Sequence, residues 1–150
     1  KLCANTFYGI ELSYPKDWFT TYNTDDQKCM FFAPYSFVIP GDTTNFPIPI
    51  KMEIFTPQEW ETNVKFYENP TDFYNVISSE NIAINGKSAK RIESTATGQD
   101  LAKKGLPKTT YLLFDDSKPL VISYQQTEPN EDVQQSKKVL EEVVNSIRHF

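Results

Sequence analysis

Two hairpin signals in the second half of the chain limit the folds that this sequence can adopt. Asn85-Gly86 lies between two strand-like runs, and Asn-Gly is the pair most favoured in a two-residue hairpin turn. Two further predicted strands, 109–114 and 120–126, are joined by Asp115-Asp116-Ser117-Lys118, which has the composition of a type I turn. Because hairpins join antiparallel neighbours, we expect a mainly antiparallel sheet.

The N-terminal stretch from Phe7 to Trp18 predicts a further strand. Its apolar residues alternate and share one face of that strand: Tyr8, Ile10, Leu12 and Tyr14. Pro15 ends the strand because it has no backbone donor, and we expect Trp18 to pack where the chain turns. The run 28–34 predicts a short buried strand that pairs with the first one as a hairpin with a long connection.

Two helices complete the predicted order of elements. Thr56-Pro57-Gln58-Glu59 is a capping box with proline at the first helical position, and Asn69-Pro70 ends that helix. A long amphipathic helix is predicted from about Pro129 to Arg148. With strands at 50–55 and within 76–97, the order is β-β-β-α-β-β-β-β-α, which is typical of an α+β domain.

The length and the charge of the chain limit its domain organisation and its partners. At 150 residues we expect one domain, 1–150, with a core rich in Phe and Tyr. The net charge of −5 disfavours nucleic acid as a partner, since an acidic surface repels phosphate backbones. No run of 18 apolar residues occurs, so we expect no membrane insertion by this domain. Because the first residue is Lys1, we expect a mature chain from which a signal, or an upstream lipid or helix anchor, has been removed.

Cys3 and Cys29 are the two cysteines of the chain, and they flank the first predicted strand. A disulfide between them would stabilise the fold by on the order of 3 kcal/mol, because it constrains the unfolded chain. The alternative is a pair of unrelated buried thiols, which are common in cytosolic proteins. We favour the disulfide, and with it an extracytoplasmic location in the cell envelope or as a secreted protein.

The sequence has few residues that suit catalysis or metal binding. The single histidine, His149, follows the last predicted helix, where we expect a helix-terminal cation and not a catalytic base. No phosphate-binding glycine loop or nucleophile elbow occurs. Asp25 and Asp26, together with Asp17, could hold a hard cation such as calcium, but such a site needs about six or more oxygen ligands. We therefore expect no enzyme activity, no cofactor and no metal.

A proline-rich loop and a set of aromatic residues are the candidate binding surfaces. The segment 35–49 has three prolines and apolar residues that we expect to be exposed: Tyr35, Phe37, Val38, Ile39 and Phe46. It is a candidate protein-binding loop, together with the polar loop around Lys103 and Lys104; the alternative is that its aromatics pack over a sheet edge. A further group could line a groove for a sugar or peptide, or pack in the core and its rim: Tyr14, Trp18, Trp60, Tyr67, Phe73 and Tyr74.

Three motifs give the chain a resemblance to a known family. They are Tyr14-Pro15-Lys16-Asp17-Trp18 at the end of the opening strand, Asn85-Gly86-Lys87 in the central hairpin, and Asn145-Ser146-Ile147-Arg148 at the end of the last helix. In these motifs and in the order of its elements, the chain resembles the PsbP-like family. The resemblance implies a three-layer α/β/α sandwich on a mainly antiparallel sheet of about six or seven strands, with a long C-terminal helix.

The members of the PsbP-like family share a theme of docking onto other proteins. They include extrinsic proteins of photosystem II in the thylakoid lumen, a nuclear import factor that binds Ran, and many bacterial lipoproteins. The resemblance and the cysteine pair imply a non-catalytic, extracytoplasmic protein-binding domain of a bacterial lipoprotein or secreted protein, monomeric and with another protein as its partner. Two alternatives stay open. One is a domain that binds a small ligand or a metal, through the aromatic groove or Asp25 and Asp26, and the other is an enzyme of unfamiliar type.

Overall fold

The structure is a computed structural model that describes residues 1–70, 72–100, 102–115 and 117–150. Its elements in chain order are β1 (Leu2–Asn5), β2 (Ile10–Ser13), the short 3-10 helix η1 (Asp25–Gln27), β3 (Phe31–Phe32), β4 (Ile50–Ile54), α1 (Pro57–Glu68), β5 (Tyr74–Ile84), β6 (Lys87–Ala96), β7 (Pro107–Leu113), β8 (Leu120–Gln125), α2 (Val133–Ser146) and β9 (Arg148–His149). The strands form a six-stranded sheet in the order β3-β4-β8-β7-β6-β5 and a three-stranded sheet in the order β1-β2-β9.

The large sheet is antiparallel between all its described neighbours, as the hairpin signals predicted. Asn85 and Gly86 connect β5 to β6 with φ angles of 53° and 80°, the left-handed conformation that an Asn-Gly hairpin turn requires. The predicted hairpin of β7 and β8 is also present. In the turn between them Asp116 lies outside the described residues, and the Asp115 carboxylate accepts from the amides of Ser117 and Lys118.

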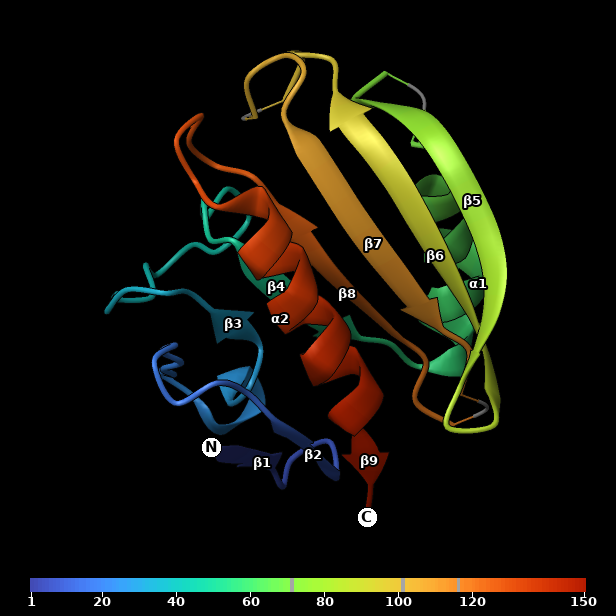
Figure 1. Cartoon of the computed structure of the whole chain (residues 1–150). Helices are drawn as coiled ribbons and strands as arrows, with labels where there is room; N and C mark the ends of the chain where they lie inside the picture. Colours follow the sequence, from blue (N-terminus) through green and yellow to red (C-terminus); the bar gives the residue numbers. More distant parts are fainter. Residues whose placement is uncertain (71, 101, 116) are drawn as a thin grey trace.

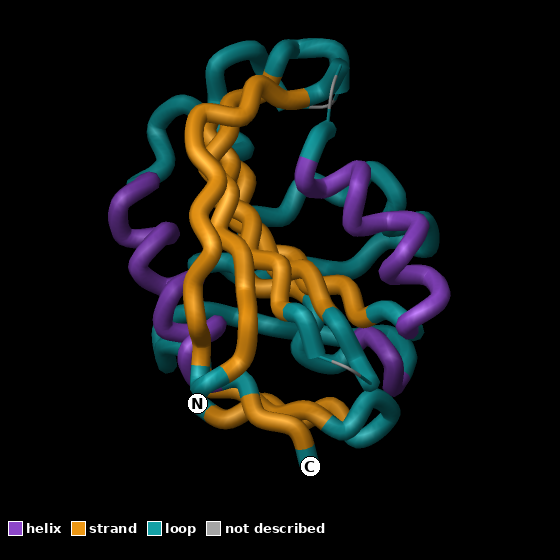
Figure 2. Tube along the Cα trace, turned by 90° about the vertical axis from the view of Figure 1, so that its right-hand side faces the viewer, coloured by secondary structure: helices purple, strands orange, loops and turns teal. Residues whose placement is uncertain are grey.

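The two helices cover opposite faces of the large sheet and make the predicted three-layer sandwich (Figure 1, Figure 2). The capping box of α1 is present: the Thr56 hydroxyl accepts from the Glu59 amide, and the Glu59 carboxylate accepts from the Thr56 amide, each at 3.2 Å. Helix α2 is shorter than the predicted range 129–148, because Asp132 caps its first turn and Ile147 is extended. Among the described residues, no helix has both the length and the apolar character needed to cross a membrane.

The predicted hairpin between the opening strand and 28–34 is wrong. Strand β2 instead pairs with β1 and β9 in the small sheet, while β3 pairs with β4 in the large one, and one isolated bridge joins Phe19 to Ala33. Residues 7–9 form a turn and not a strand, because Gly9 has a φ of 71° and donates to the Asn5 carbonyl, while the Asn5 side chain accepts from the Tyr8 amide. The small sheet lies at the end of α2, next to both chain termini (Figure 1).

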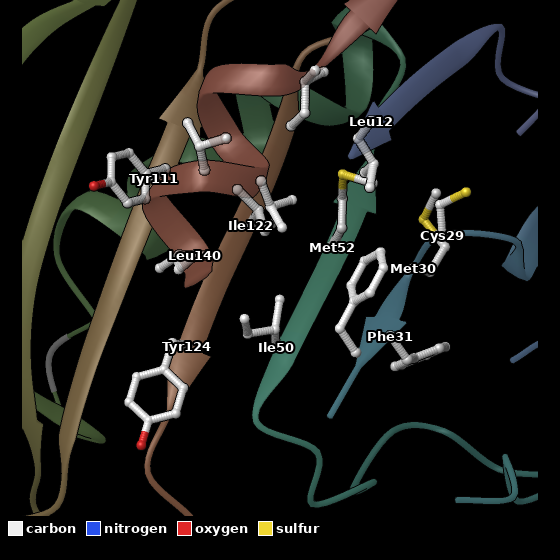
Figure 3. Packing of buried hydrophobic residues seen from close by; sticks show 14 of the residues in the cluster. Leu12, Cys29, Met30, Phe31, Ile50, Met52, Tyr111, Ile122, Tyr124 and Leu140 are labelled. Carbon is white, nitrogen blue, oxygen red and sulfur yellow. The ribbon is translucent and has the colours of Figure 1, made fainter. Parts of the chain in front are cut away.

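The main core lies between α2 and the large sheet, and the small sheet contributes to it (Figure 3). Fully or almost fully buried members include Ile10, Leu12, Phe32, Ile50, Ile122, Tyr124 and Leu140. Trp18 is 3% exposed, so it packs in this core as expected. The predicted disulfide between Cys3 and Cys29 is present, and it ties β1 to the segment that leads into β3.

Candidate functional site

The face of the large sheet opposite α2 carries polar side chains on three adjacent strands. Lys51 and Glu53 lie on β4, Ser123 and Gln125 on β8, and Lys108 on β7. They alternate with residues that face the main core: Ile50, Met52, Tyr111, Ile122 and Tyr124. In the strand register Lys51 lies opposite Ser123, and Lys108 lies opposite Gln125. The polar side chains therefore form one continuous region on the α1 side of the sheet.

Helix α1 covers the apolar part of this face and leaves a cavity over the polar part. Under the helix, the apolar contacts join Ile92, Leu112 and Val121 of the sheet to Phe55, Trp60, Val64, Tyr67 and Phe114. Beside it, the segment 44–49 and residues 100 and 102 border a partly open pocket of about 300 Å³ over the polar side chains. We call this space the α1-face cavity. The lining side chains that matter below are Phe46, Lys51, Glu53, Tyr67, Tyr74 and Lys108.

Lys108 is the most perturbed charged group of the α1-face cavity. Its Nζ atom lies 4.5 Å from the centroid of the Tyr74 ring, a cation–π distance. Burial first, and the charge of Lys51 second, lower the pKa of Lys108 to about 8, while Glu53 and Asp100 act in the opposite direction. Within the described part of the chain no ion pair or hydrogen bond to Lys108 Nζ is found. The cavity thus holds an ammonium group that lacks both full hydration and a direct anionic partner.

The two tyrosines of the cavity stay neutral over the physiological range. The Tyr67 hydroxyl donates to Glu53 Oε2 at 3.3 Å, and burial followed by the charge of Glu53 raises the pKa of Tyr67. Burial and the charge of Asp100 raise the pKa of Tyr74 to about 12. The charges of the cavity therefore come from its lysines and carboxylates, and the tyrosines supply ring faces.

Gln125 lies at the wall of the cavity with an unsatisfied acceptor. Its Nε2 donates to the carbonyls of Pro107 at 3.3 Å and of Gln126 at 2.9 Å, which fixes the orientation of the amide. Its Oε1 is buried and has no donor among the residues that the structure describes. Native proteins pair most buried polar atoms, so this acceptor is an exception, and its burial closes it to a ligand in the cavity.

The predicted protein-binding loop is only partly exposed. Val38 is 83% exposed and Tyr35 is 46% exposed, as expected. Phe37 and Phe46 are half-buried and pack against the main core. For these two residues the alternative prediction, that the aromatics pack over a sheet edge, therefore fits better than full exposure. The expected exposure of Ile39 is wrong, because its side chain is only 3% exposed and belongs to that core.

Aromatic contacts and one hydrogen bond hold the loop on the body of the protein. Phe46 lies between Phe31 and Phe37, with ring centroids 5.5 Å and 6.0 Å away. The Asn23 side chain donates to the Ile39 carbonyl at 3.0 Å. Val38 therefore projects from a loop that is anchored on both sides of it.

The structure brings the two predicted binding loops to the same cavity. Residues 44–49 of the first loop and residues 100 and 102 of the second line the α1-face cavity. Lys103 and Lys104 are exposed in the second loop, in which Leu101 lies outside the described residues. The loops predicted as one contact surface thus meet at the rim of a cavity that the sequence analysis did not predict.

The six aromatic residues proposed for a groove do not form one. The ring centroid of Tyr14 lies 5.2 Å from that of Phe32 at the main core, in which Trp18 is also buried. Trp60 packs on Phe55 and Phe114 under α1, and Phe73 does not line the cavity but contacts Phe66, which does. Only Tyr67 and Tyr74 line the α1-face cavity.

The candidate calcium ligands are not gathered into a site. Over residues 1–70, 72–100, 102–115 and 117–150, no group of three or more His, Cys, Asp or Glu side chains could hold a metal ion. Asp25 pairs with Lys28 at 3.7 Å, and Asp26 accepts from the Thr24 hydroxyl. Both carboxylates thus have local partners.

The prediction that His149 is a helix-terminal residue is wrong, because His149 belongs to β9. It lies opposite Ile10 in the small sheet because α2 ends at Ser146 and the chain then becomes extended. Its Nδ1 lies 3.8 Å from Asp115 Oδ2, and the Asp115 side chain is 9% exposed. Burial raises the pKa of Asp115, but the Lys87 ammonium and the turn amides outweigh it and hold that pKa well below its usual range.

The substitution Asp115→Asn is expected to lower the free energy of unfolding by about 1.5 kcal/mol at pH 7, because charge-assisted hydrogen bonds are lost. The folded-state pKa is depressed, so this contribution is present above about pH 4, the unfolded value, and is lost as the pH falls further. Urea unfolding at pH 7 and pH 3 measures the effect. An unchanged difference between variant and wild type at the two pH values would contradict the assignment.

Comparison with known proteins identifies the fold. No family model matches the sequence, and no curated protein matches it. The solution structure of cyanobacterial PsbP from Synechocystis sp. PCC 6803 is similar with a TM-score of 0.56 and 12% identity, over 100% of this chain and 92% of that one. A crystal structure of a Bacteroides thetaiotaomicron protein is similar with a TM-score of 0.52 and 13% identity, over 95% of this chain and 45% of that one. The helices, the sheet and these similarities together show that this chain has a PsbP-like fold.

Proposed function

We propose that residues 1–150 form one non-catalytic, extracytoplasmic domain of the bacterial lipoprotein or secreted type, which works by binding another protein. The Cys3–Cys29 disulfide supports a location in an oxidising compartment, where such bonds persist. The PsbP-like fold supports a binding role by analogy, since the family resemblance implies docking onto other proteins.

The exposure of Val38 on an anchored loop is the observation that carries the proposal. An isolated exposed apolar residue is common, but Val38 is 83% exposed and projects from a loop that Phe46 and Ile39 hold in place. Tyr35, at 46% exposure, adds an amphipathic aromatic residue of the kind enriched at interfaces. A rigid loop loses little conformational entropy on binding, which favours affinity.

Substitution of Val38 tests the proposed docking loop. We expect Val38→Asp to lower partner capture from a cell-envelope lysate at least tenfold, because a charge at the centre of an apolar contact must be desolvated. Quantitative mass spectrometry of proteins retained by the immobilised domain gives the measurement. Ile77→Asp is the matched control, since Ile77 is also an exposed apolar residue, at 69%, but lies on β5. Equal capture by the Val38 variant and the wild type would exclude this loop as the docking site.

A further inference from the structure

The α1-face cavity combines opposite charges with aromatic walls. Lys51 and Lys108 supply two cations, Glu53 supplies an anion on the same wall, and Asp100 supplies another at the rim. Ring faces of Phe46 and Tyr74 line the same space. A charged group inside a protein normally has a direct partner, yet Lys108 Nζ has none among the described residues. The Lys108 ammonium can therefore pair with an anionic group of a ligand.

The volume of the cavity suits a small molecule. The pocket measures about 300 Å³, and small-molecule sites usually run from about 300 to 1,000 Å³. Its volume fits one small organic molecule with about a dozen non-hydrogen atoms, at the lower end of the usual range for ligand sites.

We propose that the α1-face cavity binds a free α-amino acid with an aromatic or large apolar side chain. The ligand carboxylate lies between the ammonium groups of Lys51 and Lys108. The ligand ammonium lies beside the Glu53 carboxylate. The ligand side chain packs on the rings of Phe46 and Tyr74. Each charge of the ligand thus meets the opposite charge, and its apolar part meets ring faces.

The balance of charge favours a zwitterion over a simple anion or cation. A carboxylate alone would pair with the lysines but would place a third anion beside Glu53 and Asp100. An amine alone would pair with Glu53 but would repel the Lys108 ammonium, which the charge of Lys51 already destabilises. An α-amino acid carries both charges on neighbouring atoms and avoids each of these costs. This site goes beyond the proposed protein-docking loop and does not depend on it, because Val38 does not line the cavity.

Four related ligands test whether binding needs both the ammonium and the carboxylate of an amino acid. We expect L-phenylalanine to bind at least tenfold more tightly than 3-phenylpropionate, which lacks the ammonium, and than phenethylamine and phenylalaninamide, which lack the carboxylate. Titration followed by ¹H–¹⁵N NMR gives the affinities, and shifted amides should map to residues around Lys51, Lys108 and Tyr74. Binding of 3-phenylpropionate as tight as that of phenylalanine, binding away from the cavity, or no binding of phenylalanine at millimolar concentration would each overturn the proposal.

Two variants with matched controls test whether Lys108 and Glu53 bind the ligand. We expect Lys108→Met and Glu53→Gln each to weaken L-phenylalanine binding at least tenfold, because each leaves one ligand charge unpaired. Lys138→Met and Glu142→Gln make the same chemical changes on the exposed side of α2 and should leave the affinity unchanged. The NMR spectra of the variants report folding directly, and the ligand series on the wild type remains decisive if a variant does not fold. Unchanged affinity in both folded cavity variants would overturn the proposal.

Discussion

Removal of the disulfide by the double substitution Cys3→Ser and Cys29→Ser is expected to lower the free energy of unfolding by about 3.5 kcal/mol. The cysteines are 26 positions apart, and closing a loop of that length removes conformational entropy from the unfolded chain by about this amount. The small sheet should lose the most order, because the disulfide ties β1 to the segment before β3. Urea unfolding of the variant and of the oxidised wild type measures the loss.

The reduced wild type is the control for this experiment, since it removes the covalent link and keeps the cysteine side chains. We expect the reduced protein to unfold close to the double variant and well below the oxidised protein. Mass measurement of the alkylated, unreduced chain from its source verifies the starting point. Two alkylated thiols in that sample would contradict both the disulfide and the extracytoplasmic location that rests on it.

Replacement of Lys108 by methionine is expected to raise the free energy of unfolding by on the order of 2 kcal/mol at pH 7. The pKa of Lys108 falls from 10.5 to about 8 on folding, because the folded chain removes water from the ammonium group. This depressed value means that the charged form is penalised in the folded state. The penalty is complete below about pH 8 and disappears as the pH rises towards 10.5. Methionine fills a similar volume without a charge, so the variant avoids the penalty.

The pH dependence distinguishes this explanation from simple repacking. The advantage of Lys108→Met over wild type should be largest at pH 7 and should shrink between pH 8 and pH 10, as measured by urea unfolding. The comparison stops at pH 10, because Tyr67 and Tyr74 have raised pKa values and their titration changes stability above that pH. A difference that does not change with pH would show that desolvation of Lys108 is not its cause.

A lysine that lowers stability is informative about function. Groups retained at a cost to the fold are concentrated at binding and catalytic sites. If Lys108→Met stabilises the protein and also abolishes amino-acid binding, then the same ammonium group explains both results. The two experiments use one variant but independent measurements, so each can fail alone.

Local signals in the sequence predicted the elements whose turns and caps are built from neighbouring residues. Asn85-Gly86 identified its hairpin, because the left-handed turn depends on those two residues. Thr56 and Glu59 identified the start of α1 in the same way. The strand 7–14 was misplaced, because the turn at Gly9 is held by Asn5 and the partners of β2 lie at both ends of the chain. Pairing between distant segments leaves little local trace.

The cavity could have been inferred in part from the predicted architecture. In a three-layer sandwich both faces of the sheet are covered, so the polar residues that alternate with Ile50 and Met52 could not all face solvent. This alternation would have identified Lys51 and Glu53 as candidates for a polar site, although the sequence analysis did not name them. The sequence around Lys108 gave no such indication, because polar and apolar residues do not alternate clearly along β7. The residues around Lys108 in the pocket come from other strands and from two loops.

The sequence by itself determined the antiparallel sheet, the two covering helices and the partners of the disulfide. These depend on turn residues, caps, periodicity and a single possible cysteine pair, all of which act over short distances or leave no choice. Only the tertiary structure decided which loop residues are exposed, so that Val38 projects while Ile39 is buried. It also decided that Lys51, Glu53 and Lys108 line one pocket. The physical reason is that burial and charge proximity are set by the packing of segments far apart in the chain.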